Sequence, residues 1–445
     1  MAREYLYKKQ NKLLPEKRTI ALIFILCASF ASCVYAIETV VPIIPKPVGS
    51  GARALGQSAF IAVADDATAA SWNPAGLINL ERSEVSFVGA WRSVEEDYSM
   101  ANPLEFSNPE SWSDSEINFM SYAQPLQVGN ADVVLSINYH QVYDFGVEFN
   151  SYESSPILNY FGIPIGQEET QDKGKSKGAI SAYTLAGGLS IPDYPQITIG
   201  VGINWYTQSL FNSYAWQIKK TRTHTKDWDA LPTEQSQLTD EETFDDFRAQ
   251  NLTFGFLWDV YEKQENLLTF GLVYHTTFTA KVDWELVRYV DSEQPDPPRV
   301  KNMDIDFPSS LGAGVNYRFS DSLSAAFDVE WKEWSKYNQT FVNERPTIPF
   351  NEDTLAYRLG FEHLRFPGSN EQPVSALRYG AFYEPRPTWN EILPVYGLSA
   401  GVGWTFREKF SLDFAYQYRW GKEDLEDFDY EIKEQFFVAS LITYF

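Results

Sequence analysis

The sequence is poor in cysteine, histidine and basic residues. It has 2 Cys, 4 His and 36 Lys and Arg against 60 Asp and Glu, which gives a net charge of −24. A nucleic-acid partner is not expected, because binding nucleic acid requires a basic surface. No two histidines stand at metal-ligand spacing, and no nucleophile elbow, phosphate loop or HExxH motif is present. We therefore expect no metal, no cofactor and no enzymatic activity.

Long apolar runs are also missing beyond the N-terminus, which excludes a polytopic helical membrane protein. Aromatic residues, by contrast, make up 16% of the 445 residues. This content is unlike that of an acidic disordered chain, which would be aromatic-poor. It is typical of barrels whose aromatic rings line two membrane interfaces.

The first 36 residues have the three parts of a secretory signal. A basic region is followed by the apolar run 20–28 and by the small-residue ending Val34-Tyr35-Ala36. We predict cleavage after Ala36, which would also remove both cysteines, Cys27 and Cys33. Two alternatives remain open: an uncleaved anchor helix, and a lipoprotein modified at Cys33.

From residue 83 onward, apolar and polar residues alternate with period two. In 410–420, Phe410, Leu412 and Phe414 share one face, while Ser411 and Asp413 share the other. Such separation indicates strands with two different faces. The pattern predicts fourteen strands, at 83–92, 115–125, 131–141, 177–191, 195–209, 246–259, 266–290, 303–319, 322–334, 354–366, 373–384, 394–406, 409–420 and 433–445.

The predicted connections alternate between long and short along the chain. An outer-membrane barrel has short periplasmic turns, long outside loops and an even strand number, whereas a soluble sandwich has no reason to sort its loops in this way. We therefore predict an all-β fold, in which residues 83–445 form a 14-stranded antiparallel transmembrane β-barrel. We expect it in a Gram-negative outer membrane, in contact with lipid and lipopolysaccharide, with both termini in the periplasm. The terminal Phe445 resembles the signal that the barrel assembly machinery reads.

Residues 49–80 differ from the rest, being rich in Ala and Gly without alternation. They contain Gly51-Ala52-Arg53-Ala54-Leu55-Gly56, Ala62-Val63-Ala64-Asp65-Asp66-Ala67 and Trp72-Asn73-Pro74-Ala75-Gly76-Leu77. These pieces resemble the N-terminal hatch of FadL-type transporters of long-chain fatty acids and hydrocarbons. Gln57-Ser58-Ala59 stands where that family has Met-Gly-Gly. The resemblance implies a 14-stranded barrel whose lumen is plugged by a hatch, here residues 37–82.

The predicted hatch residues are small or turn-forming. Fourteen strands enclose a lumen too wide for wall side chains to fill, and a compact segment of small residues would fill it. Asp65 and Asp66 are predicted to cap a helix starting near Ala67. Whether the hatch is static or moves is left open. The hatch or gating residues are Asn73, Pro74, Ala75, Gly51, Gly56, Asp65 and Asp66.

The resemblance also implies an amphipathic substrate whose carboxylate is held by basic residues. Arginine suits this task because its guanidinium donates two parallel hydrogen bonds. Arg318, Arg358 and Arg378 are the candidates on the inward face. The alternative is a ladder of paired charges that stabilises barrel and plug.

The predicted function is passive uptake of hydrophobic or amphipathic molecules, most of all long-chain fatty acids. A barrel scaffold or shuttle for protein secretion, as in type IX secretion, and a general diffusion porin are the alternatives. Sideways release would need an interrupted wall strand, with Gly187-Gly188 and Pro125 as candidates. The apolar loop 142–176 is either a capture groove or a self-packed cover, and the acidic loop 210–245 is either solvated or a cation site.

Overall fold

The structure is a computed structural model that describes residues 45–100, 106–210, 214–228, 232–291, 293–341, 352–366, 373–387, 392–406, 409–425 and 428–445. The predicted signal segment 1–36 lies outside these residues. Among the described residues, no helix has the length and apolar character needed to cross a membrane.

Fourteen antiparallel strands pair side by side and close into a barrel, which confirms the predicted fold class. The circle closes where the first wall strand pairs with the last, with Glu84 opposite Tyr444. The wall strands are β2 (Glu84–Met100), β3 (Phe106–Val128), β4 (Ala131–Asp144), β6 (Pro164–Ile191), β7 (Tyr194–Gln208), β9 (Glu234–Lys263), β10 (Asn266–His275), β13 (Ser310–Ser320), β14 (Leu323–Lys332), β16 (Thr354–Arg365), β17 (Val374–Tyr383), β20 (Val395–Phe406), β21 (Phe410–Leu425) and β22 (Phe428–Tyr444).

The two faces of the wall lie as the alternation predicts. On β21, Phe414 is 48% exposed on the outer face, whereas Asp413 is 6% exposed on the inner face. On β14, Phe327 faces outward and Asp328 is fully buried inside. A shift of one residue would exchange the two faces of a strand. The predicted inward and outward positions are therefore correct for these two strands.

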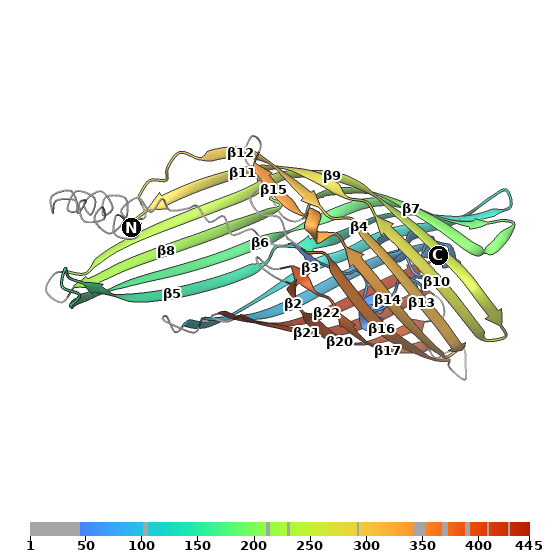
Figure 1. The fold of residues 1–445 in the computed structure, drawn as a ribbon. Helices are drawn as coiled ribbons and strands as arrows, with labels where there is room; N and C mark the ends of the chain where they lie inside the picture. The colour runs from blue at the N-terminus through green and yellow to red at the C-terminus, as the bar shows by residue number, and fades with distance from the viewer. Residues whose placement is uncertain are drawn as a thin grey trace, which may run out of the picture. The chain divides into compact units, whose positions relative to one another are not determined.

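Two of the predicted long loops, 142–176 and 210–245, are wrong, because much of each is strand. The segments 142–176 and 210–245 contain β5 (Val147–Leu158) and β8 (Trp216–Trp228), together with the first halves of β6 and β9. These strands, with β11 (Phe278–Val290), β12 (Arg299–Phe307) and β15 (Asn338–Phe341), form a second sheet joined to the wall through β6 and β9 (Figure 1). The predicted segments 266–290 and 303–319 are therefore two strands each.

β8 of the second sheet escaped the sequence pattern because most of it is polar on both faces. β8 reads WQIKKTRTHTKDW, and only Trp216 and Ile218 of it are buried. Cross-strand ion pairs such as that between Lys219 and Glu241 hold its outer part. A strand with two solvated faces has no apolar alternation to detect.

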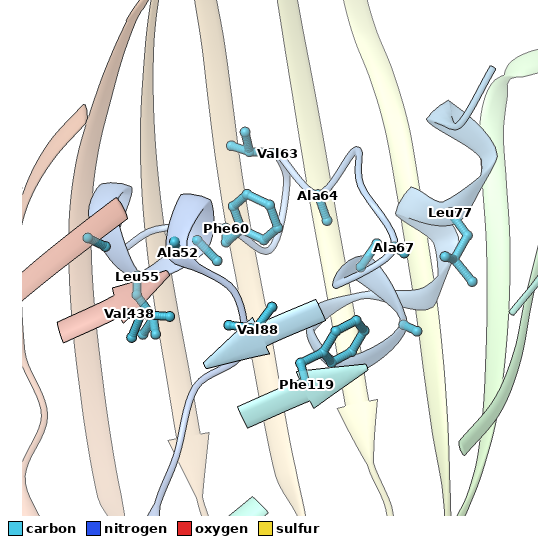
Figure 2. Packing of buried hydrophobic residues seen from close by; sticks show 14 of the residues in the cluster. Ala52, Leu55, Phe60, Val63, Ala64, Ala67, Leu77, Val88, Phe119 and Val438 are labelled. Atoms are coloured by element: carbon cyan, nitrogen blue, oxygen red, sulfur yellow. The ribbon is translucent and has the colours of Figure 1, made fainter. Parts of the chain in front are cut away.

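The hatch consists of short helical turns inside the barrel. These are α2 (Ala52–Gln57), α3 (Ala69–Trp72) and the 3₁₀ helix η1 (Pro74–Asn79), preceded by the two-residue strand β1 (Lys46–Pro47). Their alanines pack with Phe60 and Leu77 of the hatch and with Val88, Phe119 and Val438 of the wall (Figure 2). A further two-stranded sheet joins β18 (Arg386–Pro387) and β19 (Ile392–Leu393), and η2 spans Trp334–Lys336.

Candidate functional site: the hatch and the wall around it

The Asn73-Pro74-Ala75 turn joins α3 to η1. The Oδ1 atom of Asn73 accepts a hydrogen bond from the backbone nitrogen of Ala75 at 3.2 Å, and Pro74 occupies the first helical position. Proline suits this position because its missing N–H would have no partner there. Asn73 Nδ2 donates to the Ile61 carbonyl at 2.9 Å and to the Phe256 carbonyl of β9 at 3.3 Å. This one buried side chain therefore ties the turn to the hatch and to the wall.

The two predicted capping aspartates have different roles. Asp66 accepts a hydrogen bond from the backbone nitrogen of Thr68 at 2.8 Å in the turn before α3, but the N-cap residue of α3 is Thr68 and it makes no side-chain cap bond. Asp65 instead pairs with Arg53, which also reaches Glu362 of β16 at 3.0 Å. Partial burial of the Asp65 carboxyl raises its pKa to about 6, although the Arg53 guanidinium opposes this shift. In addition, 36% of the Asp65 side chain remains exposed.

The hatch contacts every one of the fourteen wall strands. Some contacts are side-chain hydrogen bonds to hatch backbone: Asn118 accepts from Gly51, and Asp328 accepts from Phe60 and Ile61 at 2.6 and 2.9 Å. The wall residues in contact are Glu84, Asn118, Val142, Gly188, Gly200, Phe256, Gly271, Gly314, Asp328, Gly360, Gly380, Ser399, Gln417 and Ser440.

Glycines on the inner face let the hatch backbone approach the wall. A Cβ atom at Gly200 would lie 2.2 Å from the backbone nitrogen of Ala75, and one at Gly360 would lie 2.0 Å from the Gln57 carbonyl oxygen. Any side chain at these positions would collide with backbone, so glycine is required by close approach. Sequence reasoning missed these residues, although their inward parity within predicted strands is a usable signal.

A cavity of about 390 Å³ lies between the hatch and the end of the wall near the C-terminus. Arg53, Asp65, Glu84, Arg378 and Asp413 are among its lining residues. Ion pairs line its wall side: Arg378 Nε donates to Glu362 at 2.6 Å, and Arg378 Nη1 donates to Asp413 at 2.6 Å. The charged groups of hatch and wall thus form one network on this side of the hatch.

The three candidate arginines lie in different surroundings. Arg378 is 5% exposed and held by two carboxylates. Arg358 is 7% exposed and donates to Glu384 at 2.7 Å and to Glu330 at 2.8 Å. Arg318 donates to the Glu265 carbonyl beside the β9–β10 turn at 3.1 Å. This pairing favours the alternative of a charge ladder, and their role in binding a substrate stays a prediction.

The wall ladder is interrupted between β3 and β4. Their pairing ends at Phe119 opposite His140. Among the described residues, the part of β3 that precedes Phe119 has no register partner on β4 or β5. Instead, β1 pairs with the end of β4, with Lys46 opposite Asp144. At another place in the wall, β8 continues beyond the end of β7 and pairs with both β6 and β9. We call the interval between β3 and the β4–β5 segment the seam.

Neither predicted interruption is present. Gly187 and Gly188 pair with β4 on one side and with β7 on the other, and Pro125 pairs with Val134. No sequence signal marked the seam. The residues of β3 that precede Phe119 still pair with β2 on their other edge, so they are part of a strand like the rest of β3.

Buried aromatic rings lie beyond the hatch, where the wall meets the second sheet. Trp216 stacks on Phe145 and Phe244 with centroids 4.4 and 4.2 Å apart, and Phe278 stacks on Phe307 at 4.7 Å. Phe145 was predicted as part of an apolar loop, and it is indeed buried. Tyr160 and Phe161, from the same segment, are 97% and 81% exposed at the tip of the β5–β6 hairpin. The predicted acidic loop is mostly ion-paired strand, and no group of three ligating side chains occurs in its described part.

Comparison with known proteins gives one family. Residues 46–429 match the family described as outer membrane protein transport protein (OMPP1/FadL/TodX). A Pseudomonas aeruginosa FadL homologue is similar in structure, with 15% identity, a TM-score of 0.60 and coverage of 91% of this chain and 100% of the homologue.

Two further solved structures are similar at lower scores. The Pseudomonas putida toluene transporter TodX has 12% identity and a TM-score of 0.54, over 91% of this chain and 100% of its own. The CymD monoaromatic hydrocarbon channel has 14% identity and a TM-score of 0.51, over 90% and 98%. A search of curated proteins gave no match. Because the family match covers most of the sequence, the chain belongs to the OMPP1/FadL/TodX family of outer-membrane transport proteins.

Proposed function

We propose that the protein mediates passive uptake of hydrophobic small molecules across the outer membrane, and that these molecules leave sideways through the seam. The observation that carries this proposal is the end of the β3–β4 pairing at Phe119 and His140, directly beside the hatch. Transfer from water into lipid lowers the free energy of a solute that is poorly soluble in water. An opening in the wall therefore suits it better than an opening into the periplasm.

The hatch supports this route over that of a diffusion porin. It contacts every wall strand, and its alanines and Phe60 are buried in the lumen. A porin would need an open aqueous lumen, which this packing opposes. The proposal predicts no steady ion conductance of the purified protein in planar bilayers.

Long-chain fatty acids are one proposed substrate class. A carboxylate would have to displace Glu330, Glu384, Glu362 or Asp413 from Arg358 or Arg378, because these acidic groups already hold the two guanidinium groups. Competition between dodecane and dodecanoate for uptake tests this point directly. The aromatic hydrocarbons named for TodX and CymD are a second class, favoured by the buried rings around Trp216.

A disulfide that fixes β1 on the edge of β4 that faces the seam tests the exit route. Pro47 and Tyr143 are antiparallel partners, so the double variant Pro47→Cys/Tyr143→Cys would fix β1 to β4. We expect oxidation to lower uptake of labelled hydrocarbon into proteoliposomes and reduction to restore it. The matched control, Leu377→Cys/Val402→Cys, crosslinks two continuously paired wall strands and should not change uptake. Equal uptake in all redox states would refute the seam as the exit.

The secretion-scaffold alternative is separated by ligand binding. Purified protein that binds no hydrocarbon or lipid, yet retains its barrel, would favour the scaffold. A gain in binding with increasing apolar chain length would favour uptake, because each buried CH₂ contributes about 0.8 kcal/mol.

A further inference from the structure

Six polar, uncharged residues form one row across the inner wall. Each is the register partner of the next, on β2, β3, β4, β6, β7 and β9 in turn. All are buried, with at most 7% exposure. In order, they are Ser86, Ser121, Asn138, Thr184, Asn204 and Asn251.

One half of the row is internally hydrogen-bonded. Thr184 Oγ1 donates to Asn204 Oδ1 at 2.6 Å, and Asn204 Nδ2 donates to Asn251 Oδ1 at 2.7 Å. Asn251 Nδ2 in turn donates to the Thr276 carbonyl at 2.9 Å. This half is a closed polar network that needs no ligand.

The other half has no partners. The hydroxyls of Ser86 and Ser121 and both amide atoms of Asn138 are buried without a hydrogen bond, as is the hydroxyl of Ser136, two residues from Asn138 on β4. Buried polar groups are nearly always satisfied in folded proteins. Four side chains of this kind on adjacent strands therefore indicate a missing hydrogen-bonding group.

The surroundings define the chemistry of that group. The register partners of Ser121, Ser136 and Asn138 are themselves uncharged, namely Ser86, Ala123, Thr184 and Ala186. The apolar side chains of Phe119 and Val134 flank them on the same strands. A carboxylate placed here would lack a cation, and burying an unpaired charge is unfavourable. A hydroxyl or carbonyl group on an apolar body is complementary to this site.

We propose that Ser86, Ser121, Ser136 and Asn138 bind the hydroxyl or carbonyl group of a neutral amphipathic molecule. This inference rests on the proposed uptake function and specifies its substrate class. Ser121 and Asn138 pair two positions before Phe119 and His140, where the ladder ends. A molecule held by its polar group at Asn138 would therefore lie beside the seam.

The test compares three ligands of equal chain length. Tritiated 1-dodecanol, dodecane and dodecanoate are each titrated against the purified protein in nanodiscs, and empty nanodiscs give the background. We expect dodecanol to bind best. Asn138→Leu should weaken dodecanol binding by on the order of tenfold, as for the loss of one or two hydrogen bonds, and should leave dodecane binding unchanged.

Thr184→Val is the matched control, because it removes a hydroxyl from the satisfied half of the row. It should leave the preference for dodecanol over dodecane intact. Heat resistance on gels provides a second readout. Without ligand, Asn138→Leu should be at least as heat-resistant as the parent, because it removes unsatisfied groups, whereas Thr184→Val should be less so.

The outcomes separate this inference from the proposed function. If none of the three ligands binds, uptake of hydrophobic molecules itself is refuted. If the parent binds dodecanol no better than dodecane, and Asn138→Leu does not change either affinity, the polar groups of the row bind only water. The inference is then overturned. The same holds if dodecanoate binds best and Asn138→Leu does not affect it.

Discussion

Ala75 of the hatch and Gly200 of the wall approach each other so closely that no Cβ atom fits between them. A Cβ atom at position 200 would lie 2.2 Å from the Ala75 nitrogen and 2.3 Å from the Pro74 carbonyl carbon. Backbone cannot yield as a flexible side chain can. The position of the Asn73-Pro74-Ala75 turn therefore depends on Gly200, and also on Gly255 of β9, where a Cβ atom would lie 2.3 Å from Asn73 Oδ1.

Gly200→Ala should displace the hatch while leaving the barrel assembled. Overpacking of a tight contact destabilises by about 1–3 kcal/mol, and the wall strands remain paired. Gly202→Ala is the control on the same strand, because a Cβ atom there meets nothing closer than 3.5 Å. Limited proteolysis should cut the hatch faster in Gly200→Ala only. Equal digestion of both variants would contradict the close-packing argument.

Asn73→Ala should loosen the hatch more than the barrel. It removes the bonds to Ala75, Ile61 and Phe256, and each buried group left unpaired costs about 1–3 kcal/mol. Asn73→Asp, which keeps the acceptor for Ala75 but loses the donor, should lie between parent and Asn73→Ala. We expect heat-resistant migration on gels to persist and uptake of labelled hydrocarbon to change. Unchanged uptake would favour a static hatch.

Arg378→Leu should destabilise the folded barrel by about 3–5 kcal/mol, because it leaves Glu362 and Asp413 without this partner. Adding Asp413→Asn should recover part of the loss. Denaturant unfolding in detergent measures both effects. If Arg378 instead binds a substrate carboxylate, dodecanoate uptake would fall with little loss of stability, and the charge-ladder interpretation would be wrong.

The raised pKa of Asp65, about 6, gives stability a defined pH dependence. The folded state binds this proton more tightly than the unfolded state does, so Asp65 is most favourable below its ordinary pKa near 4. This advantage is lost as pH rises through 6. Relative to Asp65→Asn, the parent should thus lose thermal stability between pH 4 and 6 and change little above pH 7. A flat difference across this range would argue against the shift.

Charge on the outer face should prevent insertion, while charge beside the cavity should not. Phe414→Lys would place an ammonium in hydrocarbon, costing about 2–4 kcal/mol at the midplane. Thr405→Lys would point into the cavity between hatch and wall, which Asp65 and Glu84 also line. The yield of heat-resistant protein after folding into lipid should fall only for Phe414→Lys.

The sequence by itself determined the fourteen wall strands, their inward and outward faces, and the hatch. Apolar and polar residues alternate there because one face of each strand meets lipid and the other meets the lumen. The Asn73-Pro74-Ala75 turn was also readable, because its residue types fix the local backbone.

Only the tertiary structure decided what these elements contact. The second sheet, the seam at Phe119 and His140, and the partners of Arg358 and Arg378 depend on pairing between distant residues, such as Arg378 with Asp413. The fit of Gly200 against Ala75 and the unequal halves of the row through Asn138 are likewise set by register across strands. Such contacts leave no local periodicity in the sequence, because they join residues that are far apart in the chain and come together only when the barrel closes.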